Sequence, residues 1–232
     1  MSFRTKVGAI AVVAAACVLL APAAMASSGP VQVTGKQLKS ALLPASDFQP
    51  GYTASNENDS GRKLEHRSFY QLSSMKCQTF WTLIGEAPGF GDTAFAGNLV
   101  EDKTATASVF EIFEQSVYQF ASSHAASSFY SQLNAKYRSC RSTSASDTQG
   151  GTLRWLVRSQ AKQHVGSHQA VLLVERTSDS KVAGGALTTD VLWTIDGTDV
   201  YMISTTLVTT PTPQPTQSSL TLKLIARVAA LR

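Results

Sequence analysis

The sequence is poor in charged residues and lacks the motifs by which many enzymes are recognised. Charged residues make up 16% of its 232 residues, against about 25% in typical soluble domains. It contains no G-x-S-x-G nucleophile elbow, no P-loop and no dinucleotide-binding fingerprint. It also has no run of Lys and Arg that could follow a nucleic-acid backbone. These absences argue against an assignable catalytic site, a bound cofactor and a nucleic-acid partner.

The N-terminus has the three parts of a secretory signal. Arg4 and Lys6 form a short positive segment, and the 18 residues from Val7 to Ala24 carry no charge. Ala24-Met25-Ala26 supplies the small residues that a signal peptidase recognises. We therefore predict that residues 1–26 are a signal peptide, cleaved between Ala26 and Ser27, and that the protein is secreted.

Two membrane-tethered alternatives remain open for the same segment. The apolar run is just long enough to span a bilayer as an uncleaved anchor, although Pro22 and the Ala-rich end favour cleavage. A lipid on Cys17 is the second alternative. Cys17 is a poor match for lipidation, because Ala14 stands where a large aliphatic residue is expected and the chain stays apolar after the cysteine.

Cleavage would leave a modestly charged chain with two cysteines. Losing two of the 20 basic residues leaves 18 against 16 acidic ones, a net charge of +2. Cys77 and Cys140 would then meet in an oxidising compartment, where one disulfide is the simplest outcome and two buried free thiols are the alternative. No C-x-x-C motif is present, so the disulfide is expected to be structural rather than redox-active.

Hydrophobic periodicity predicts four helices. Thr34-x-x-Gln37 has capping-box spacing and opens a short helix that ends before Pro44. A second helix follows Ser74, a third follows Ser122 or Ser123, and a fourth lies near the C-terminus. Their apolar stripes are Cys77, Phe80, Trp81 and Ile84; Ala126, Phe129, Tyr130, Leu133, Tyr137 and Cys140; and Leu220, Leu224, Val228 and Leu231. Because both cysteines fall on helical stripes, we predict an inter-helix disulfide.

Strand composition recurs between and after these helices. The expected strands cover residues 94–100, 109–120, 154–159, 170–177, 186–195 and 200–208. Asp196-Gly197 predicts a hairpin between the last two, and residues 51–63 are expected to form an exposed loop. The order predicts an α+β fold, with a central antiparallel sheet and helices packed on one face.

The order of these features resembles a known family, the PknH-like extracellular (sensor) domains of actinobacteria. The matching features are Ala41-Leu42-Leu43-Pro44 followed by Asp47 to Tyr52, Cys77 with Trp81, residues 117–120 leading into a helix that ends at Cys140, a late hairpin around Gly197, and a C-terminal helix. The resemblance covers residues 36–232, preceded by a flexible segment at 27–35. It implies an α+β domain with a broad cleft for an unidentified extracellular ligand.

This chain departs from the receptor kinase of that family in two ways. The receptor carries a second disulfide, which the cysteine count excludes here. The receptor also carries a kinase domain and a second membrane segment, and this sequence shows neither. The chain is therefore identified as a stand-alone exported member.

Histidines and paired carboxylates are the remaining candidates for chemistry. His164 and His168 have the i, i+4 spacing of a helical metal site, but Val165-Gly166 between them favours a turn, so no metal is predicted. A Ser/His/Asp triad needs no sequence proximity and stays open. Glu111 and Glu114 flank Phe113 in a strand and are expected to face solvent.

We therefore predict a secreted, non-catalytic domain of the ligand-binding or sensor type. Its partner would be an extracellular small molecule or a cell-envelope component, bound in a largely pre-formed apolar cleft. The alternatives are a secreted hydrolase with a Ser/His/Asp site and a structural cell-envelope module. The sequence assigns no catalytic or binding residues.

Overall fold

Nine strands of this chain form one antiparallel sheet. The structure, a computed structural model, describes residues 31–48, 50–54, 71–72, 77, 92–102, 111–146, 151–179, 186–207 and 216–232. The strand order is β1-β3-β4-β9-β8-β7-β6-β5-β2, and all neighbours are antiparallel. The predicted signal peptide, with its cleavage site at Ala26 and Ser27, lies outside the described residues.

The sheet confirms the predicted α+β class and extends most of the predicted strands. Its strands are β1 (Tyr52–Ala54), β2 (Gln71–Leu72), β3 (Asp92–Asp102), β4 (Glu111–Phe120), β5 (Ser142–Ser146), β6 (Thr152–Val165), β7 (His168–Asp179), β8 (Ala186–Asp196) and β9 (Asp199–Leu207). The predicted hairpin joins β8 and β9, and Gly197 occupies the turn with a φ of 56°, which favours glycine. The predicted loop at 51–63 is wrong at Tyr52–Ala54, and its remaining residues from 55 lie outside the described part.

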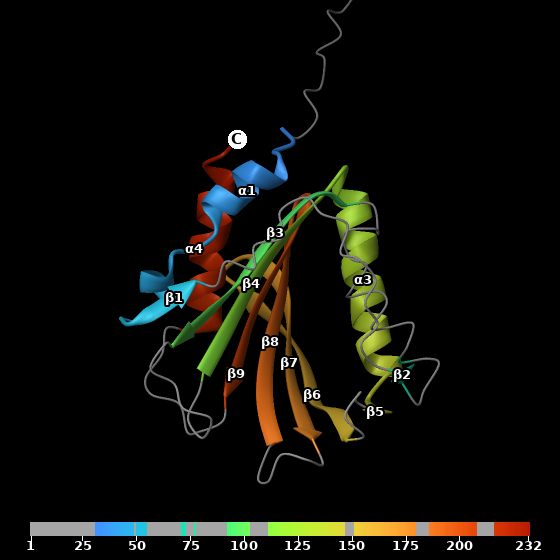
Figure 1. Ribbon diagram of the computed structural model, residues 1–232. Coiled ribbons are helices and arrows are strands. Elements are labelled where there is room, and N and C mark those ends of the chain that lie inside the picture. Colours follow the sequence, from blue (N-terminus) through green and yellow to red (C-terminus); the bar gives the residue numbers. More distant parts are fainter. Residues whose placement is uncertain are drawn as a thin grey trace, which may run out of the picture.

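Helices cover both faces of the sheet, which corrects the prediction that they share one. Helices α1 (Gly35–Ala41) and α4 (Gln217–Ala229) lie on one side, and α3 (Ser123–Ser139) lies on the other (Figure 1). A 3-10 turn (Ala45–Asp47) follows α1. Alternate residues of the central strands are apolar on both sides: Phe113 and Val117 belong to one core cluster, Tyr118 and Phe120 to the other. A sheet with two apolar faces needs a layer on each.

Side-chain caps explain where the helices begin, and those of α1 and α3 were predicted from the sequence. Thr34 and Gln37 cap α1 reciprocally, as predicted. The Ser122 side chain accepts from Ala125 N at the start of α3, and Thr216 does the same for Ser219 N at α4. In the described part of the chain, no helix is long and apolar enough to cross a membrane.

The α1/α4 face is closed by a buried glutamine on β4. Gln115 is fully buried; its Oε1 accepts from Leu43 N at 2.9 Å and its Nε2 donates to Leu43 O at 2.8 Å. These two bonds satisfy the Leu43 N–H and C=O, where the backbone leaves α1. The same face of the sheet otherwise carries the apolar cluster that includes Leu38, Phe113 and Leu224. The amide therefore attaches the N-terminal helix to the sheet.

Replacing Gln115 by leucine should lower the free energy of unfolding by about 2 kcal/mol, because the Leu43 N–H and C=O would stay buried without partners. Denaturant unfolding of the two proteins measures the difference. Gln132→Leu on the exposed side of α3 is the matched control, with an expected change within about 0.5 kcal/mol. Equal effects of the two substitutions would contradict the role assigned to Gln115.

The structure contains the predicted Cys77–Cys140 disulfide, with a Cα–Cα distance of 5.1 Å. The prediction that it joins two helices is wrong, because Cys140 is the C-cap residue that follows α3 and is not part of the helix. The helical stripe that predicted a helix around Cys77 lies outside the described residues apart from Cys77 itself. Both cysteines are buried in the cluster on the α3 face.

Candidate functional site

A groove lies between α3 and the strands β6 and β7, on the face of the sheet that α3 covers. Its volume is about 630 Å³, within the range of small-molecule sites. Twelve residues line it: Tyr130, Ser131, Asn134, Arg138, Arg141, Gln160, Lys162, Gln163, His164, Gln169, Ala170 and Val171. Only Ala170 and Val171 lack a polar side chain, so this groove is polar, whereas the expected cleft was apolar.

A β-bulge in β6 gives the groove one of its walls. Val157 pairs with Glu175, and Ser159 pairs with Val174, so Arg158 is an extra residue between two matched positions. An inserted residue shifts every later side chain to the opposite face of the sheet. Gln160 and Lys162 consequently face α3 from positions opposite Leu173 and Val171, two members of the core on that side.

The other wall is the exposed border of α3. Tyr130, Asn134 and Arg138 recur at four-residue spacing and therefore lie on one side of the helix. Arg141 follows Cys140 directly, and Arg141 O accepts from Val157 N at 2.8 Å. The disulfide at Cys140 and this hydrogen bond hold the end of α3 against β6. Both therefore fix the segment that carries Arg138 and Arg141.

Two polar atoms in the groove walls are buried without hydrogen bonds. The Tyr130 side chain is 8% exposed, and its hydroxyl has no hydrogen-bond partner in the described part of the chain; nor has Oε1 of Gln160. Gln160 is positioned by its Nε2, which donates to Asn134 O at 3.2 Å. Burial raises the pKa of Tyr130 to about 12, and the nearby Asn134 side chain limits the rise. The hydroxyl therefore stays protonated and can donate.

The charge of the groove has one sign. Arg138, Arg141 and Lys162 bring three positive charges, and none of the described residues that line the groove is acidic. None of the ion pairs within the described part of the chain uses these residues. The groove therefore attracts anions.

A partly buried carboxyl lies on β7, on the face of the sheet that α3 covers. Glu175 accepts from Trp155 Nε1 at 3.0 Å, and burial, opposed by hydrogen bonds from Trp155 and Tyr137, raises its pKa. Trp155 and Tyr137 are themselves buried in the core that contains the disulfide. This cluster supports the end of α3 from inside the core.

A second carboxyl on this face corrects an expectation. Glu114 was expected to face solvent, but it is half-buried on the α3 side of β4, where burial raises its pKa to about 7. Glu111 points to the opposite face, where its Oε2 accepts from Tyr52 Oη at 2.6 Å. The two carboxyls therefore do not form a catalytic pair.

The raised pKa of Glu114 should make stability depend on pH. Because the folded-state pKa exceeds the ordinary value of 4.5, the associated stabilisation is present below pH 4.5 and is lost as pH rises through about 7. Glu114→Gln removes this loss, so the variant should exceed the wild type by about 2 kcal/mol at pH 8 and match it at pH 4. Denaturant unfolding at both pH values measures the effect.

Glu101→Gln, at an exposed position of β3, is the matched control and should change stability equally at both pH values. If Glu114→Gln gives no gain at pH 8 beyond that of the control, the carboxyl is not held in a desolvating environment.

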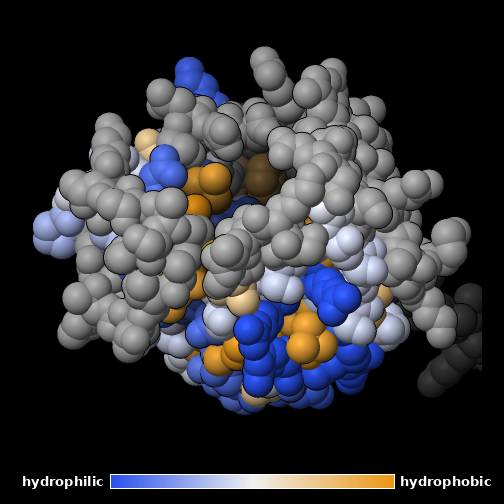
Figure 2. Space-filling view, turned by 60° about the horizontal axis from the view of Figure 1, so that its bottom comes forward, coloured by the Kyte–Doolittle hydropathy of each residue, from blue (hydrophilic) through white to orange (hydrophobic). Residues whose placement is uncertain are grey.

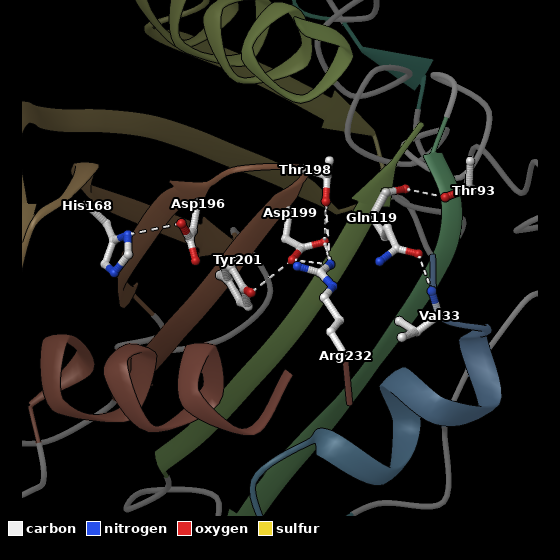
Figure 3. A network of polar contacts seen from close by, with 9 residues as sticks. All are labelled: Val33, Thr93, Gln119, His168, Asp196, Thr198, Asp199, Tyr201 and Arg232. Atoms are coloured by element: carbon white, nitrogen blue, oxygen red, sulfur yellow. Dashed lines mark hydrogen bonds and ion pairs between the residues drawn. The ribbon is translucent and has the colours of Figure 1, made fainter. Parts of the chain in front are cut away.

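The face covered by α1 and α4 carries a buried ion pair. Asp199 on β9 is fully buried and accepts from Arg232 Nη2 at 2.6 and 2.8 Å. The Tyr201 hydroxyl donates to the same carboxylate at 3.2 Å. Figure 3 shows Arg232 reaching back from the end of the chain to this carboxylate. Burial raises the pKa of Asp199, and Arg232 limits the rise. The arrangement ties the C-terminus to the sheet.

The histidines do not form the sites that their spacing suggested. His164 ends β6 and His168 begins β7, and the turn between them places one on the α3 face and the other on the opposite face. His168 Nδ1 lies 3.4 Å from Asp196 Oδ1 (Figure 3). The described histidines, which include His124, hydrogen bond to no serine within the described residues, and these residues hold no cluster of metal ligands. His66 lies outside the described part.

Exposed hydrophobic surface does not mark a binding face either. In the described part of the chain, the exposed large hydrophobic residues are Val31, Leu156 and Leu222, which are separated in the fold. Figure 2 shows small hydrophobic groups among hydrophilic side chains at the end of the molecule that it views. The polar groove is therefore the stronger candidate.

Comparison with known proteins agrees with this architecture. The PknH-like extracellular domain family matches residues 33–191. The chain belongs to this family. The crystal structure of the extracellular domain of PknH from Mycobacterium tuberculosis is similar, with a TM-score of 0.61 and 15% sequence identity over 86% of this chain and 98% of that chain. At this identity the likeness shows the fold. No curated protein matches the chain.

A second solved structure matches more weakly. It is an uncharacterized protein, the Rv0999 ortholog from Mycobacterium smegmatis, with 11% identity over 84% of this chain and 94% of that chain and a TM-score of 0.36. The family assignment and the PknH fold confirm the resemblance identified from the sequence. The groove residues of this PknH-like domain were not predicted, because a bulge and a helix end bring them together and neither leaves a sequence motif.

Proposed function

We propose that this PknH-like domain is an exported, non-catalytic binding domain whose ligand occupies the groove between α3 and β6–β7. The proposal rests mainly on two buried polar atoms, the Tyr130 hydroxyl and Gln160 Oε1, which have no hydrogen-bond partner among the described residues and lie in the walls of a concavity of about 630 Å³. Buried polar groups ordinarily have partners. A ligand could supply the missing hydrogen bonds once the side chains that cover these two atoms shift aside.

An extracellular location is supported by the family and by the predicted signal peptide at residues 1–26. Outside the cytoplasm the partner would be a small molecule or a cell-envelope component. Binding would act by stabilising the arrangement of α3 against β6, because a ligand that prefers one arrangement shifts the population toward it. The disulfide at the end of α3 limits how far that helix can move.

A groove-filling substitution tests the proposal. Ser131 is exposed and lines the groove, whereas its exposed neighbour Gln132 does not. We expect a thermal-shift screen against envelope fragments and small metabolites to identify ligands whose stabilisation is lost in Ser131→Trp and kept in Gln132→Trp. The proposal is wrong if no ligand class stabilises the exported protein, or if every ligand found stabilises both variants equally.

A further inference from the structure

The groove also indicates which chemical class its ligand belongs to. We infer that it binds an acidic sugar, a carbohydrate that carries a carboxylate or a phosphate together with free hydroxyl groups. This inference rests on the proposed function, since it names the ligand of the same groove. It follows from three properties of the lining: the sign of its charge, the kind of hydrogen bonds left unmade, and the scarcity of apolar surface.

The charge selects an anion. Arg138 and Arg141 lie at the end of α3, and Lys162 lies on β6 two residues past Gln160, whose side chain bonds to Asn134. Among the described residues, no acidic side chain lines the groove. An arginine guanidinium presents paired N–H donors that match a carboxylate or a phosphate. All three cations are solvent-exposed, so they can meet a charged group without first being desolvated.

The unmade hydrogen bonds select hydroxyl groups next to that anion. The buried Gln160 Oε1 can only accept, so its partner must donate. The Tyr130 hydroxyl can donate or accept. A sugar hydroxyl does both and satisfies either atom, whereas a simple ionised carboxylate such as acetate has no donor for Gln160. The Tyr130 hydroxyl and Gln160 Oε1 therefore distinguish an acidic sugar from a bare carboxylate.

The apolar surface argues against an anionic lipid as the group bound inside the groove. Of the two lining residues without polar side chains, Val171 faces α3 and is buried, whereas Ala170 belongs to the cluster on the opposite face of the sheet. The described lining therefore offers too little exposed apolar surface for an acyl chain. Gln169 and Asn134 line the same space and can hydrogen bond to further hydroxyl groups.

Galacturonate, galactose and galactosamine are matched probes, since they present an acidic, a neutral and a basic sugar. Their dissociation constants can be measured by following the backbone amide resonances of α3 and β6 in the exported protein. We expect galacturonate to bind at least tenfold more tightly than the other two sugars, and its affinity to fall as salt is added. Tighter binding of galactose or galactosamine would overturn the charge selection while leaving the proposed function intact. Failure of all three sugars, together with a failed ligand screen, would remove both.

Charge-removing substitutions locate the binding site. Arg138→Gln and Lys162→Gln should each weaken galacturonate binding at least fivefold. Arg158→Gln removes an exposed positive charge from the same strand, outside the groove, and should leave the affinity unchanged. If all three substitutions weaken binding equally, the affinity depends on the overall charge of the protein, and the assignment of the binding site to the groove is wrong.

The hydroxyl contacts have a separate test. Tyr130→Phe removes one oxygen and should weaken galacturonate binding while leaving the much weaker binding of acetate unchanged. If acetate binds as tightly as galacturonate, the groove is an anion site without sugar recognition, and the inference is wrong. Oligogalacturonate then distinguishes the source: tenfold tighter binding than the monomer indicates an envelope polysaccharide, and equal binding indicates a free sugar acid.

Discussion

Removing the Cys77–Cys140 disulfide is expected to lower the free energy of unfolding by about 4 kcal/mol. The bond closes a loop with a sequence separation of 63, and the chain-entropy model gives a stabilisation of this size for such a loop. Both cysteines are buried within the α3-face core, so reduction would also loosen the packing around them. Denaturant unfolding of the oxidised and reduced protein measures the difference.

The double variant Cys77→Ala/Cys140→Ala is the control for side effects of the reductant. It should unfold like the reduced wild type and should not respond to reductant. A wild type whose unfolding is insensitive to reductant would contradict the stabilising role. The groove should respond as well, because Arg138 and Arg141 flank Cys140: the anion affinity of the reduced protein should fall while its secondary structure is retained.

The sequence predicted most helices and strands because their signals are local. Ser122 and Thr34 cap helices as expected, and the apolar stripe from Ala126 to Tyr137 is buried as its spacing indicated. Strand composition and the Asp196-Gly197 turn signal also predicted the strands and the hairpin at Gly197. These features depend on neighbours within a few residues, so a single sequence is enough to reveal them.

The errors have physical reasons that lie beyond such local signals. The strand predicted at 154–159 continues to Val165, but the bulge at Arg158 reverses the alternation of side chains and hides the second half. Which face a helix covers is decided by tertiary contacts, so the sequence could not tell that α1 and α4 oppose α3. For the same reason a polar groove built from a helix end and a bulged strand escaped notice.

The buried ion pair on the other face leads to the second large effect. Replacing Arg232 by methionine removes the charge but keeps much of the side-chain length. The Asp199 carboxylate then stays buried without the guanidinium donor and keeps the Tyr201 hydroxyl. Removing one partner of a buried ion pair typically destabilises a protein by about 3 to 5 kcal/mol. Because the Arg232 side chain is 25% exposed, we expect the lower end, about 3 kcal/mol at pH 8, in denaturant unfolding.

The pH dependence of this loss distinguishes the charge from the packing. Burial already raises the pKa of Asp199, and Arg232 holds the rise back; without the guanidinium the pKa rises further. The variant therefore takes up a proton as pH falls, so its deficit should be smaller at pH 4 than at pH 8. Lys223→Met breaks the exposed pair with Asp47 and should lose less than about 1 kcal/mol at either pH. Adding Asp199→Asn to Arg232→Met should recover much of the stability at pH 8, because no buried charge is then left unpaired. If the deficit is equal at both pH values and unchanged in the double variant, Arg232 acts through packing alone.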